Sequence, residues 1–173
     1  VRNGDNIFLT GGAGTGKSFT LHKIIELLQV THSQERVFVT ASTGMAACAI
    51  GGTTVHSFAG IGLGREGAHE LSEKVLARAQ IKKRWLACRA LVIDEVSMLD
   101  GSLFQKLDYI ARRVKSSRWT RPSTMQPVDP QSVPFGGIQL VLCGDFYQLP
   151  PVAGRRDEPA PQFLFESRAW HES

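Results

Sequence analysis

Residues 11–18 form a glycine-rich run that ends in a lysine and a serine: Gly11-Gly12-Ala13-Gly14-Thr15-Gly16-Lys17-Ser18. The spacing fits the phosphate-loop pattern G-x-x-x-x-G-K-[ST]. Glycines let backbone N–H groups surround a phosphate chain without side-chain clashes, and the amino end of a following helix adds favourable partial charge. A glycine-rich turn that binds nothing is the alternative. The expected nucleotide-binding residues are Gly12, Ala13, Gly14, Thr15, Gly16, Lys17, Ser18 and Phe19.

Two adjacent acids, Asp94 and Glu95, follow the apolar run Leu91-Val92-Ile93. Ligands of α/β proteins bind at the carboxyl ends of strands, so an acidic pair there can serve a nucleotide site. We expect Lys17 to reach the β and γ phosphates of ATP, and Ser18 and Asp94 to hold Mg²⁺. Glu95, just past the strand, can orient and deprotonate water. A solvated turn is the alternative for the pair.

A third segment, residues 143–151, reads Cys-Gly-Asp-Phe-Tyr-Gln-Leu-Pro-Pro and ends in a stiff diproline. Its amide residue, Gln148, can donate to a phosphate oxygen and accept from water at once. We therefore expect Gln148 to sense the γ phosphate and act with Lys17 and Glu95 as the catalytic set. The alternative is that Gln148 caps its own turn.

Strand and helix patterns alternate along the chain, which favours an α/β fold with a mostly parallel sheet covered by helices on both faces. Helical apolar faces occur over Lys17–Gln29 and over Leu103–Val114. If Glu95 is the catalytic base, the strand that leads to Gln148 should lie between the strand before the phosphate loop and the strand before the acidic pair. The expected strands are Ile7–Thr10, Arg36–Thr40, Leu91–Asp94 and Gln139–Cys143.

The composition suits one globular domain: 173 residues, 42% hydrophobic and 21% charged. Apolar runs are too short to cross a bilayer, so we expect no membrane partner. The net charge of +4 permits an anionic partner without requiring one. Cys48, Cys88 and Cys143 have no short-spaced pair, so we expect buried thiols rather than a disulfide framework or zinc site. The start at Val1 suggests a piece of a longer protein.

Composition shifts between residues 116 and 134, where four prolines accompany Ser, Thr and Gln without an apolar period. We expect a flexible insertion at residues 116–133. Basic residues cluster around Trp119, and a solvated basic face is favoured over a DNA site for them. They are Arg112, Arg113, Lys115, Arg118 and Arg121.

Further motifs lie between these three segments, and one of them extends the acidic pair. They are Thr40-Ala41-Ser42-Thr43-Gly44-Met45-Ala46-Ala47, Gly52-Thr53-Thr54-Val55-His56-Ser57-Phe58, Ile93-Asp94-Glu95-Val96-Ser97-Met98, Lys106-Leu107-Asp108-Tyr109-Ile110-Ala111-Arg112 and Pro134-Phe135-Gly136-Gly137-Ile138-Gln139. Together with the phosphate loop, this order resembles that of superfamily 1B DNA helicases. The last two motifs resemble the stretch that separates the Pif-type (petite-integration-frequency) helicases from their RecD-like relatives, although here residues 116–133 interrupt it.

The resemblance implies that residues 1–173 form the first RecA-like P-loop ATPase domain of an ATP-dependent helicase moving 5′ to 3′ on DNA. The second motor domain, with its arginine fingers, would be absent from this chain, and the adenine-reading Gln would lie upstream. The isolated chain is therefore expected to hydrolyse ATP weakly or not at all.

The resemblance also assigns a single-strand DNA track to Ser42, Thr43, Gly44, Thr54, His56, Ser57 and Phe58. Small hydroxyl residues suit phosphates, and His56 and Phe58 could stack on bases. A core position is the alternative for Phe58.

The implied cofactors are ATP and Mg²⁺, and the implied partners are single-stranded DNA and DNA junctions or G-quadruplexes. A monomer in the nucleus or mitochondrion, acting in replication, repair, recombination or telomere processing, is the expectation. Two rival functions are open: an AAA-type remodelling ATPase, and a nucleotide-gated DNA-binding module without turnover.

Overall fold

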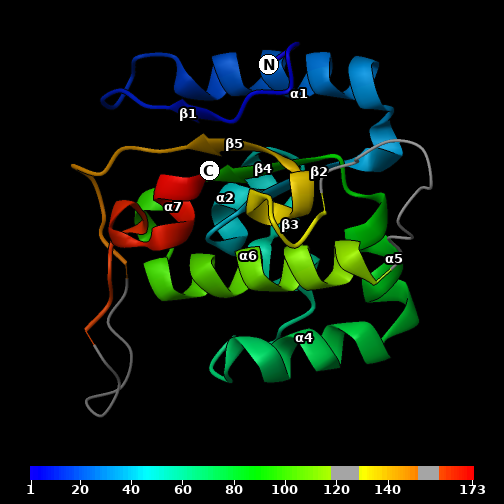
Figure 1. Cartoon of the computed structure of the whole chain (residues 1–173). Coiled ribbons are helices and arrows are strands. Elements are labelled where there is room, and N and C mark those ends of the chain that lie inside the picture. Colours follow the sequence, from blue (N-terminus) through cyan, green and yellow to red (C-terminus); the bar gives the residue numbers. More distant parts are fainter. Residues whose placement is uncertain (118–128, 152–159) are drawn as a thin grey trace.

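Five parallel strands form one sheet in the order β1-β5-β4-β2-β3 (Figure 1). The computed structural model describes residues 1–117, 129–151 and 160–173. The strands are β1 (Ile7–Leu9), β2 (Val37–Ala41), β3 (Thr53–Thr54), β4 (Ala90–Asp94) and β5 (Gln139–Cys143). The sequence predicts four of these strands to within a residue or two, but not the two-residue β3.

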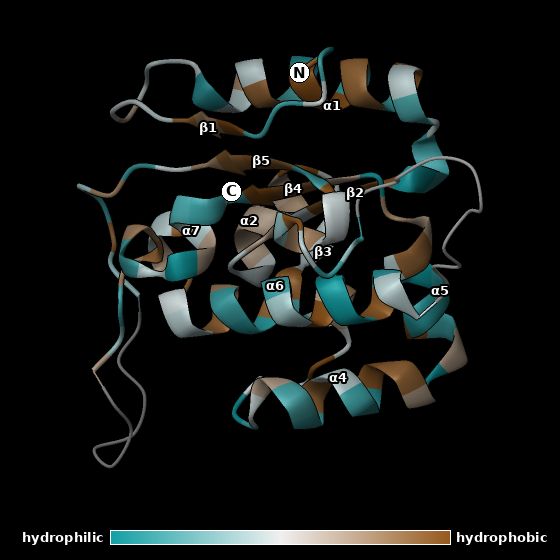
Figure 2. Cartoon of the chain, viewed as in Figure 1, coloured by the Kyte–Doolittle hydropathy of each residue, from teal (hydrophilic) through white to brown (hydrophobic). Residues whose placement is uncertain are grey.

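The central position of β5 confirms the predicted strand order. Val141 of β5 lies opposite Ile7 of β1 on one side and opposite Val92 of β4 on the other. All residues of β4 and β5 are buried, and Figure 2 shows β1, β4 and β5 as largely hydrophobic. Apolar runs without alternation are typical of strands covered on both faces. The carboxyl ends of β1, β4 and β5, which we call the site strands, therefore meet at one edge of the sheet.

One face of the sheet is covered by α1 (Lys17–His32) and α2 (Gly44–Ala49). Helix α1 begins at the predicted residue and ends beyond the predicted Gln29. Its buried residues Leu21, Ile25 and Leu28 pack with Val92 and Val141 of the central strands. The apolar period read from the sequence is thus the face that attaches the phosphate-loop helix to the sheet.

The other face is covered by helices that belong to a second hydrophobic cluster: α3 (Val55–Ala59), α4 (Ala68–Ala77), α5 (Ala79–Ala87) and α6 (Gly101–Ser116). Helix α6 runs below the sheet, with α4 packed against it on the far side (Figure 1). Asp100 caps α6 by accepting from the backbone N–H groups of Ser102 (2.8 Å) and Leu103 (3.1 Å). The predicted apolar face of α6 is confirmed, since Leu103, Leu107, Ile110 and Val114 are all buried.

Short elements complete the described chain. Four 3₁₀ turns and one terminal helix join the longer elements: η1 (Gln34–Arg36), η2 (Val96–Met98), η3 (Pro134–Gly137), η4 (Leu164–Glu166) and α7 (Arg168–Glu172). The rings of Phe8, Phe146, Phe163, Phe165 and Trp170 contact one another at centroid distances of 5.0 to 6.1 Å. This aromatic cluster fastens the end of the described chain to β1 and to the loop after β5.

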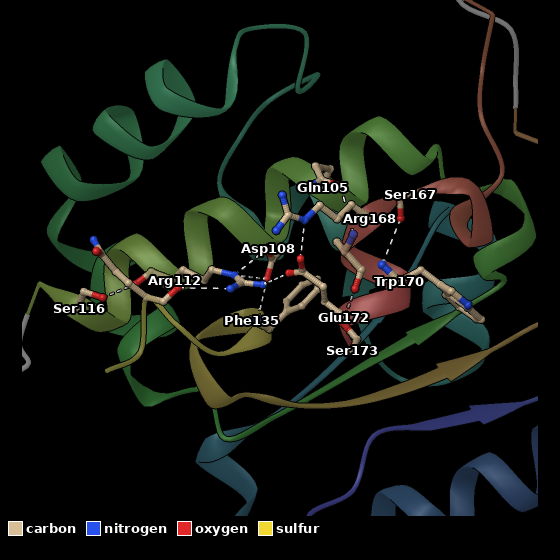
Figure 3. A network of polar contacts seen from close by, with 12 residues as sticks. Gln105, Asp108, Arg112, Ser116, Phe135, Ser167, Arg168, Trp170, Glu172 and Ser173 are labelled. Atoms are coloured by element: carbon tan, nitrogen blue, oxygen red, sulfur yellow. Dashed lines mark hydrogen bonds and ion pairs between the residues drawn. The ribbon is translucent and has the colours of Figure 1, made fainter. Parts of the chain in front are cut away.

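The basic residues at the end of α6 do not form the solvated face that was expected. Arg112 donates to Asp108 (2.8 Å) and to Glu172 of α7 (2.8 Å), and Asp108 also accepts from the backbone N–H of Phe135 (Figure 3). Arg113 pairs with Glu73, and the half-buried Lys115 donates to the backbone carbonyls of Leu86 and Cys88. The expectation fails because the partners come from α4, α5, α7 and η3, which are distant in sequence. Arg118, Trp119 and Arg121 lie outside the described residues.

Three further expectations concern single features of the chain. Most of the expected insertion, residues 118–128, lies outside the described residues, while residues 116 and 117 end α6. All three cysteines are free; Cys88 and Cys143 are buried as expected, but Cys48 is exposed on α2. Within the described ranges, none of the helices has the length and apolar character needed to cross a membrane.

Candidate functional site

The phosphate loop connects β1 to α1, and its own hydrogen bonds hold it closed. Gly16 adopts a left-handed conformation (φ 88°) immediately before α1, which glycine tolerates better than other residues. The Lys17 ammonium group donates to the carbonyl of Gly12 (2.9 Å) and to that of Gly11, and the Thr15 hydroxyl also donates to Gly12 (2.8 Å). Lys17 thus folds back over the loop, where a bound phosphate could replace these carbonyl contacts.

The expected nucleotide-binding residues line an open surface. Gly12, Ala13, Gly14, Thr15 and Gly16 are all exposed. Ser18 and Phe19 follow in the first turn of α1 and are exposed as well, with 71% of Phe19 accessible. Backbone N–H groups of the loop and the Ser18 hydroxyl are therefore accessible to a ligand, and the Phe19 ring offers an apolar surface beside them.

The acidic pair ends β4 with an abrupt turn. Asp94 is the last strand residue, is 9% exposed and accepts a hydrogen bond from the backbone N–H of Glu95 (2.9 Å). Glu95 has a left-handed backbone (φ 53°, ψ 46°), a conformation that costs a non-glycine residue about 1–2 kcal/mol. Local strain of this kind concentrates at functional sites. Asp94 is thus held in place while the chain turns sharply at Glu95.

Charges from three segments converge on Glu95. Burial raises the pKa of Glu95, and the negative charges of Asp94 and Asp145 raise it further, whereas the Lys17 charge lowers it. Burial and the neighbouring Asp94 raise the pKa of the Cys143 thiol at the end of β5. The phosphate loop, the acidic pair and the loop after β5 therefore meet at one edge of the sheet. This convergence is what the predicted strand order requires.

The loop after β5 is organised by Asp145, a residue to which the sequence analysis gave no role. Its carboxylate accepts from the Gln148 side-chain amide (3.0 Å) and from the backbone N–H of Tyr147 (3.0 Å). These bonds lower the pKa of Asp145, with the Gln148 bond the larger cause. Aspartates in turns often accept a hydrogen bond from the backbone N–H two residues later. An aspartate directly after the apolar strand and Gly144 was therefore a sequence signal for this turn. Gln148 is exposed and, in this structure, held within its own turn, as the alternative for it predicts.

The donors suit a magnesium ion held jointly with a nucleotide. Mg²⁺ prefers oxygen ligands and usually keeps waters, with one or two carboxylates and substrate phosphates in its shell. Asp94 supplies a nearly buried carboxylate, and Ser18 supplies an exposed hydroxyl at the start of α1. These two residues fit the ion.

The two segments expected to track DNA start at the same edge of the sheet. Thr43 caps α2 by accepting from Ala46 N–H (3.3 Å), and Thr54 caps α3 by accepting from Ser57 N–H (3.1 Å). Because Ala41 and Thr54 are register partners in β2 and β3, both helices leave adjacent strands. Gly44 and Ser57 are exposed, while Ser42, Thr43, Thr54 and His56 are half-buried.

One backbone hydrogen bond connects the expected DNA segment to the acidic pair. The backbone N–H of Ser42 donates to the carbonyl of Asp94 (3.1 Å). The Ser42 hydroxyl is inaccessible and lacks a hydrogen-bond partner within the described part of the chain. A displacement of residues 42–44 would therefore also move the backbone of Asp94.

Phe58 is a core residue and not a base-stacking one. Its side chain is 1% exposed, and its ring centroid lies 5.0 Å from that of Phe38 and 4.8 Å from that of Trp85. A ring buried to this degree has no face for a base, so the stacking expectation for Phe58 is wrong. His56 remains a stacking candidate; burial lowers its pKa, which favours the neutral imidazole.

Comparison with known proteins gives a consistent set of similarities. A family model described as PIF1-like helicase matches residues 1–173. The ATP-dependent DNA helicase PIF1 of Saccharomyces cerevisiae is 51% identical over 172 residues, which are 99% of this chain and 18% of that protein. A crystal structure of the Pif1 helicase from Candida albicans has a TM-score of 0.83 and 47% identity, over 99% of this chain and 34% of that one.

A more distant structure carries ligands. The Pif1 helicase from Bacteroides, crystallised with ADP-AlF3 and single-stranded DNA, has a TM-score of 0.71 and 27% identity, over 99% of this chain and 37% of that one. The chain spans about a fifth of the length of the yeast helicase and about a third of each of these two crystallised chains.

Proposed function

Because this chain belongs to the PIF1-like helicase family, we propose that it is the nucleotide-hydrolysing first motor domain of an ATP-dependent DNA helicase. The observation that carries the proposal is that β1, β5 and β4, which are adjacent and parallel, bring Lys17, Asp94, Glu95 and Asp145 to one sheet edge. The related helicase from Bacteroides was crystallised with ADP-AlF3 and single-stranded DNA, which supports nucleotide and DNA as the ligands proposed here.

Each site residue has a distinct part in the proposed reaction. Loop N–H groups and Lys17 bind the phosphates, and Ser18 and Asp94 hold Mg²⁺, which would neutralise charge on the β and γ phosphates. Glu95 orients a water and accepts its proton, a role favoured by a raised carboxyl pKa. Gln148 would exchange its bond to Asp145 for the γ phosphate, so that the loop after β5 responds to nucleotide state.

The DNA track is proposed for Ser42, Thr43, Gly44, Thr54, His56 and Ser57. Its support is the common origin of α2 and α3 at one sheet edge and the bond from Ser42 to Asp94, which gives DNA a route to the nucleotide site. The exposed Ser57 and the backbone N–H groups of the two segments suit phosphates, and His56 suits a base.

Finer features of the parent protein rest on the family resemblance. We propose 5′-to-3′ movement, DNA junctions or G-quadruplexes as preferred substrates, action in replication, repair, recombination or telomere maintenance, and a monomer in the nucleus or mitochondrion. A second motor domain would supply arginine to the γ phosphate, so residues 1–173 alone should hydrolyse ATP weakly; such an arginine is typically worth about 10³- to 10⁵-fold in rate.

The test uses the intact protein that contains this chain. ATP hydrolysis is measured with and without single-stranded DNA, and unwinding is measured on duplexes that carry either a 5′ or a 3′ tail. The proposal predicts DNA-stimulated hydrolysis and unwinding from the 5′ tail, both abolished by Lys17→Ala and retained by Lys23→Ala, an exposed lysine on the same helix that pairs with Glu26. Binding of ATP and DNA without turnover would favour the gated binding module. Hydrolysis unaffected by DNA would favour the remodelling ATPase.

A further inference from the structure

Four consecutive backbone carbonyls at the end of α3 accept hydrogen bonds from side chains of one neighbouring segment. The Arg84 guanidinium donates to the carbonyls of Ser57 (2.7 Å) and Phe58 (2.9 Å). The Trp85 indole N–H donates to Ala59 (3.2 Å), and Arg78 donates to Gly60 (3.3 Å). We call these three side chains the α3 clamp.

Helix α3 needs such partners because it is only five residues long. The last four carbonyls of any helix lack partners within the helix, and one turn of helix is unstable by itself. Thr54 closes the amino end, and the clamp closes the carboxyl end. Two of the clamp residues are cations, which also complement the partial negative charge at a helix carboxyl end.

The clamp is itself anchored in the core. Trp85 is fully buried against Phe58. Gly60 adopts φ +70° directly beside Ile81 of α5, so close that a Cβ at position 60 would lie 2.6 Å from the Ile81 side chain. The turn after α3 therefore packs so closely on α5 that it leaves no room for a side chain at position 60.

The other end of α5 is fixed by α6. The Lys115 ammonium donates to the carbonyl of Leu86 (3.2 Å) and to that of Cys88, so it caps the carboxyl end of α5. Gly136 of η3 packs on Lys115, because a Cβ at position 136 would lie 2.7 Å from the Lys115 stem. A continuous series of contacts thus runs from η3 through Lys115, α5 and the clamp to α3.

We propose that Arg84 is a positioning residue for DNA binding: it holds α3 so that Thr54, His56 and Ser57 face the DNA, and it does not contact DNA itself. The inference rests on the proposed DNA track. Arg84 is half-buried, and its hydrogen bonds within the described part of the chain both go to α3 carbonyls, which commits its charge to the helix end. Trp85 and Arg78 share this role through their bonds to Ala59 and Gly60.

The experiment compares Arg84→Gln with Arg84→Lys and with Lys83→Gln in the intact protein. Lys83→Gln is the matched control, since it removes the same charge from an exposed position of α5. Affinity for fluorescent oligo-dT is measured over a range of salt concentrations. Affinity for a fluorescent ATP analogue is measured without DNA.

Arg84→Gln should weaken oligo-dT binding roughly tenfold, since bonds from a charged donor are lost. The dependence of log Kd on log salt should stay as in the wild type, and ATP-analogue affinity should not change. Arg84→Lys should recover part of the loss, and Lys83→Gln should stay within about twofold of the wild type. Trp85→Phe, which keeps an aromatic ring in the core but removes the indole N–H group and some buried volume, gives a second test with the same pattern.

Three results would overturn the inference. If Arg84→Gln and Trp85→Phe both bind oligo-dT as the wild type does, α3 does not depend on the clamp, and the proposed DNA track stands. If Arg84→Gln reduces the salt slope by about one, Arg84 contacts a phosphate directly. Failure of the wild type to bind oligo-dT would instead refute the DNA track, and the inference with it.

Discussion

The backbone nitrogen of Val96 lies 3.0 Å from the point that a Cβ at Gly144 would occupy. This close approach joins the ends of β4 and β5, because Val96 follows the acidic pair and Gly144 opens the loop of Asp145 and Gln148. The Gly144 N–H also donates to the carbonyl of Leu9 at the end of β1 (3.1 Å). One glycine therefore sets the spacing among all three site strands.

Gly144→Ala should disturb catalysis more than binding. The added methyl group must displace the Val96 backbone or side chain by a few tenths of an ångström, and small displacements of reacting groups can cost about 10- to 100-fold in rate. ATP turnover of the intact protein should fall by that factor, with ATP-analogue affinity nearly unchanged. Gly67→Ala is the control, since nothing lies within 4 Å of its added Cβ. Equal turnover in both variants would show that the contact has no catalytic consequence.

Substitutions at Phe58 and His56 should distinguish the effect of core packing from that of DNA contact. Phe58→Leu should destabilise the protein by about 1–2 kcal/mol, because a buried ring is replaced by a smaller side chain. Its loss of oligo-dT affinity, measured below the unfolding temperature, should be smaller than that of His56→Ala. His56→Ala should have the opposite profile, with DNA affinity lowered by about 1–3 kcal/mol if the imidazole stacks on a base. An unchanged free energy of unfolding in Phe58→Leu would contradict the core assignment.

Lys115 should give the folded protein a pH dependence. Burial lowers the pKa of Lys115 to about 8, below the value of 10.5 for an ordinary lysine. Between these values the unfolded chain binds more protons than the folded one, so the free energy of unfolding should rise as pH increases from about 8 to about 10. Denaturant unfolding of the wild type and Lys115→Met across this range isolates the effect. A difference between the two proteins that does not change with pH would contradict the lowered pKa.

The placement of the candidate nucleotide-site residues was largely predictable because it follows from local rules. A phosphate loop needs a strand before it and a helix after it, and Lys17 and Ser18 stand at the required spacing. Because the strands are parallel, the acidic pair after β4 and the loop after β5 must lie at the same edge of the sheet. The position of β5 between β1 and β4 follows from the same reasoning.

Tertiary partners were not predictable from the sequence. Phe58 and His56 are two residues apart on one short helix, and only the packing of Trp85 and Phe38 determines which of them is buried. Arg112 and Lys115 read as solvated charges because their partners, Glu172 and the carbonyls of α5, come from distant segments. The left-handed backbone of Glu95 likewise has no signal in residue type.

The most direct test of the account is ATP turnover by Glu95→Gln in the intact protein with saturating single-stranded DNA. The amide keeps the shape of the side chain but cannot accept the proton of water. ATP-analogue affinity should match the wild type while turnover falls by roughly 10²-fold or more. Lys17→Ala, by contrast, should lose binding and turnover together. Wild-type turnover by Glu95→Gln would contradict the assignment of Glu95 as the base.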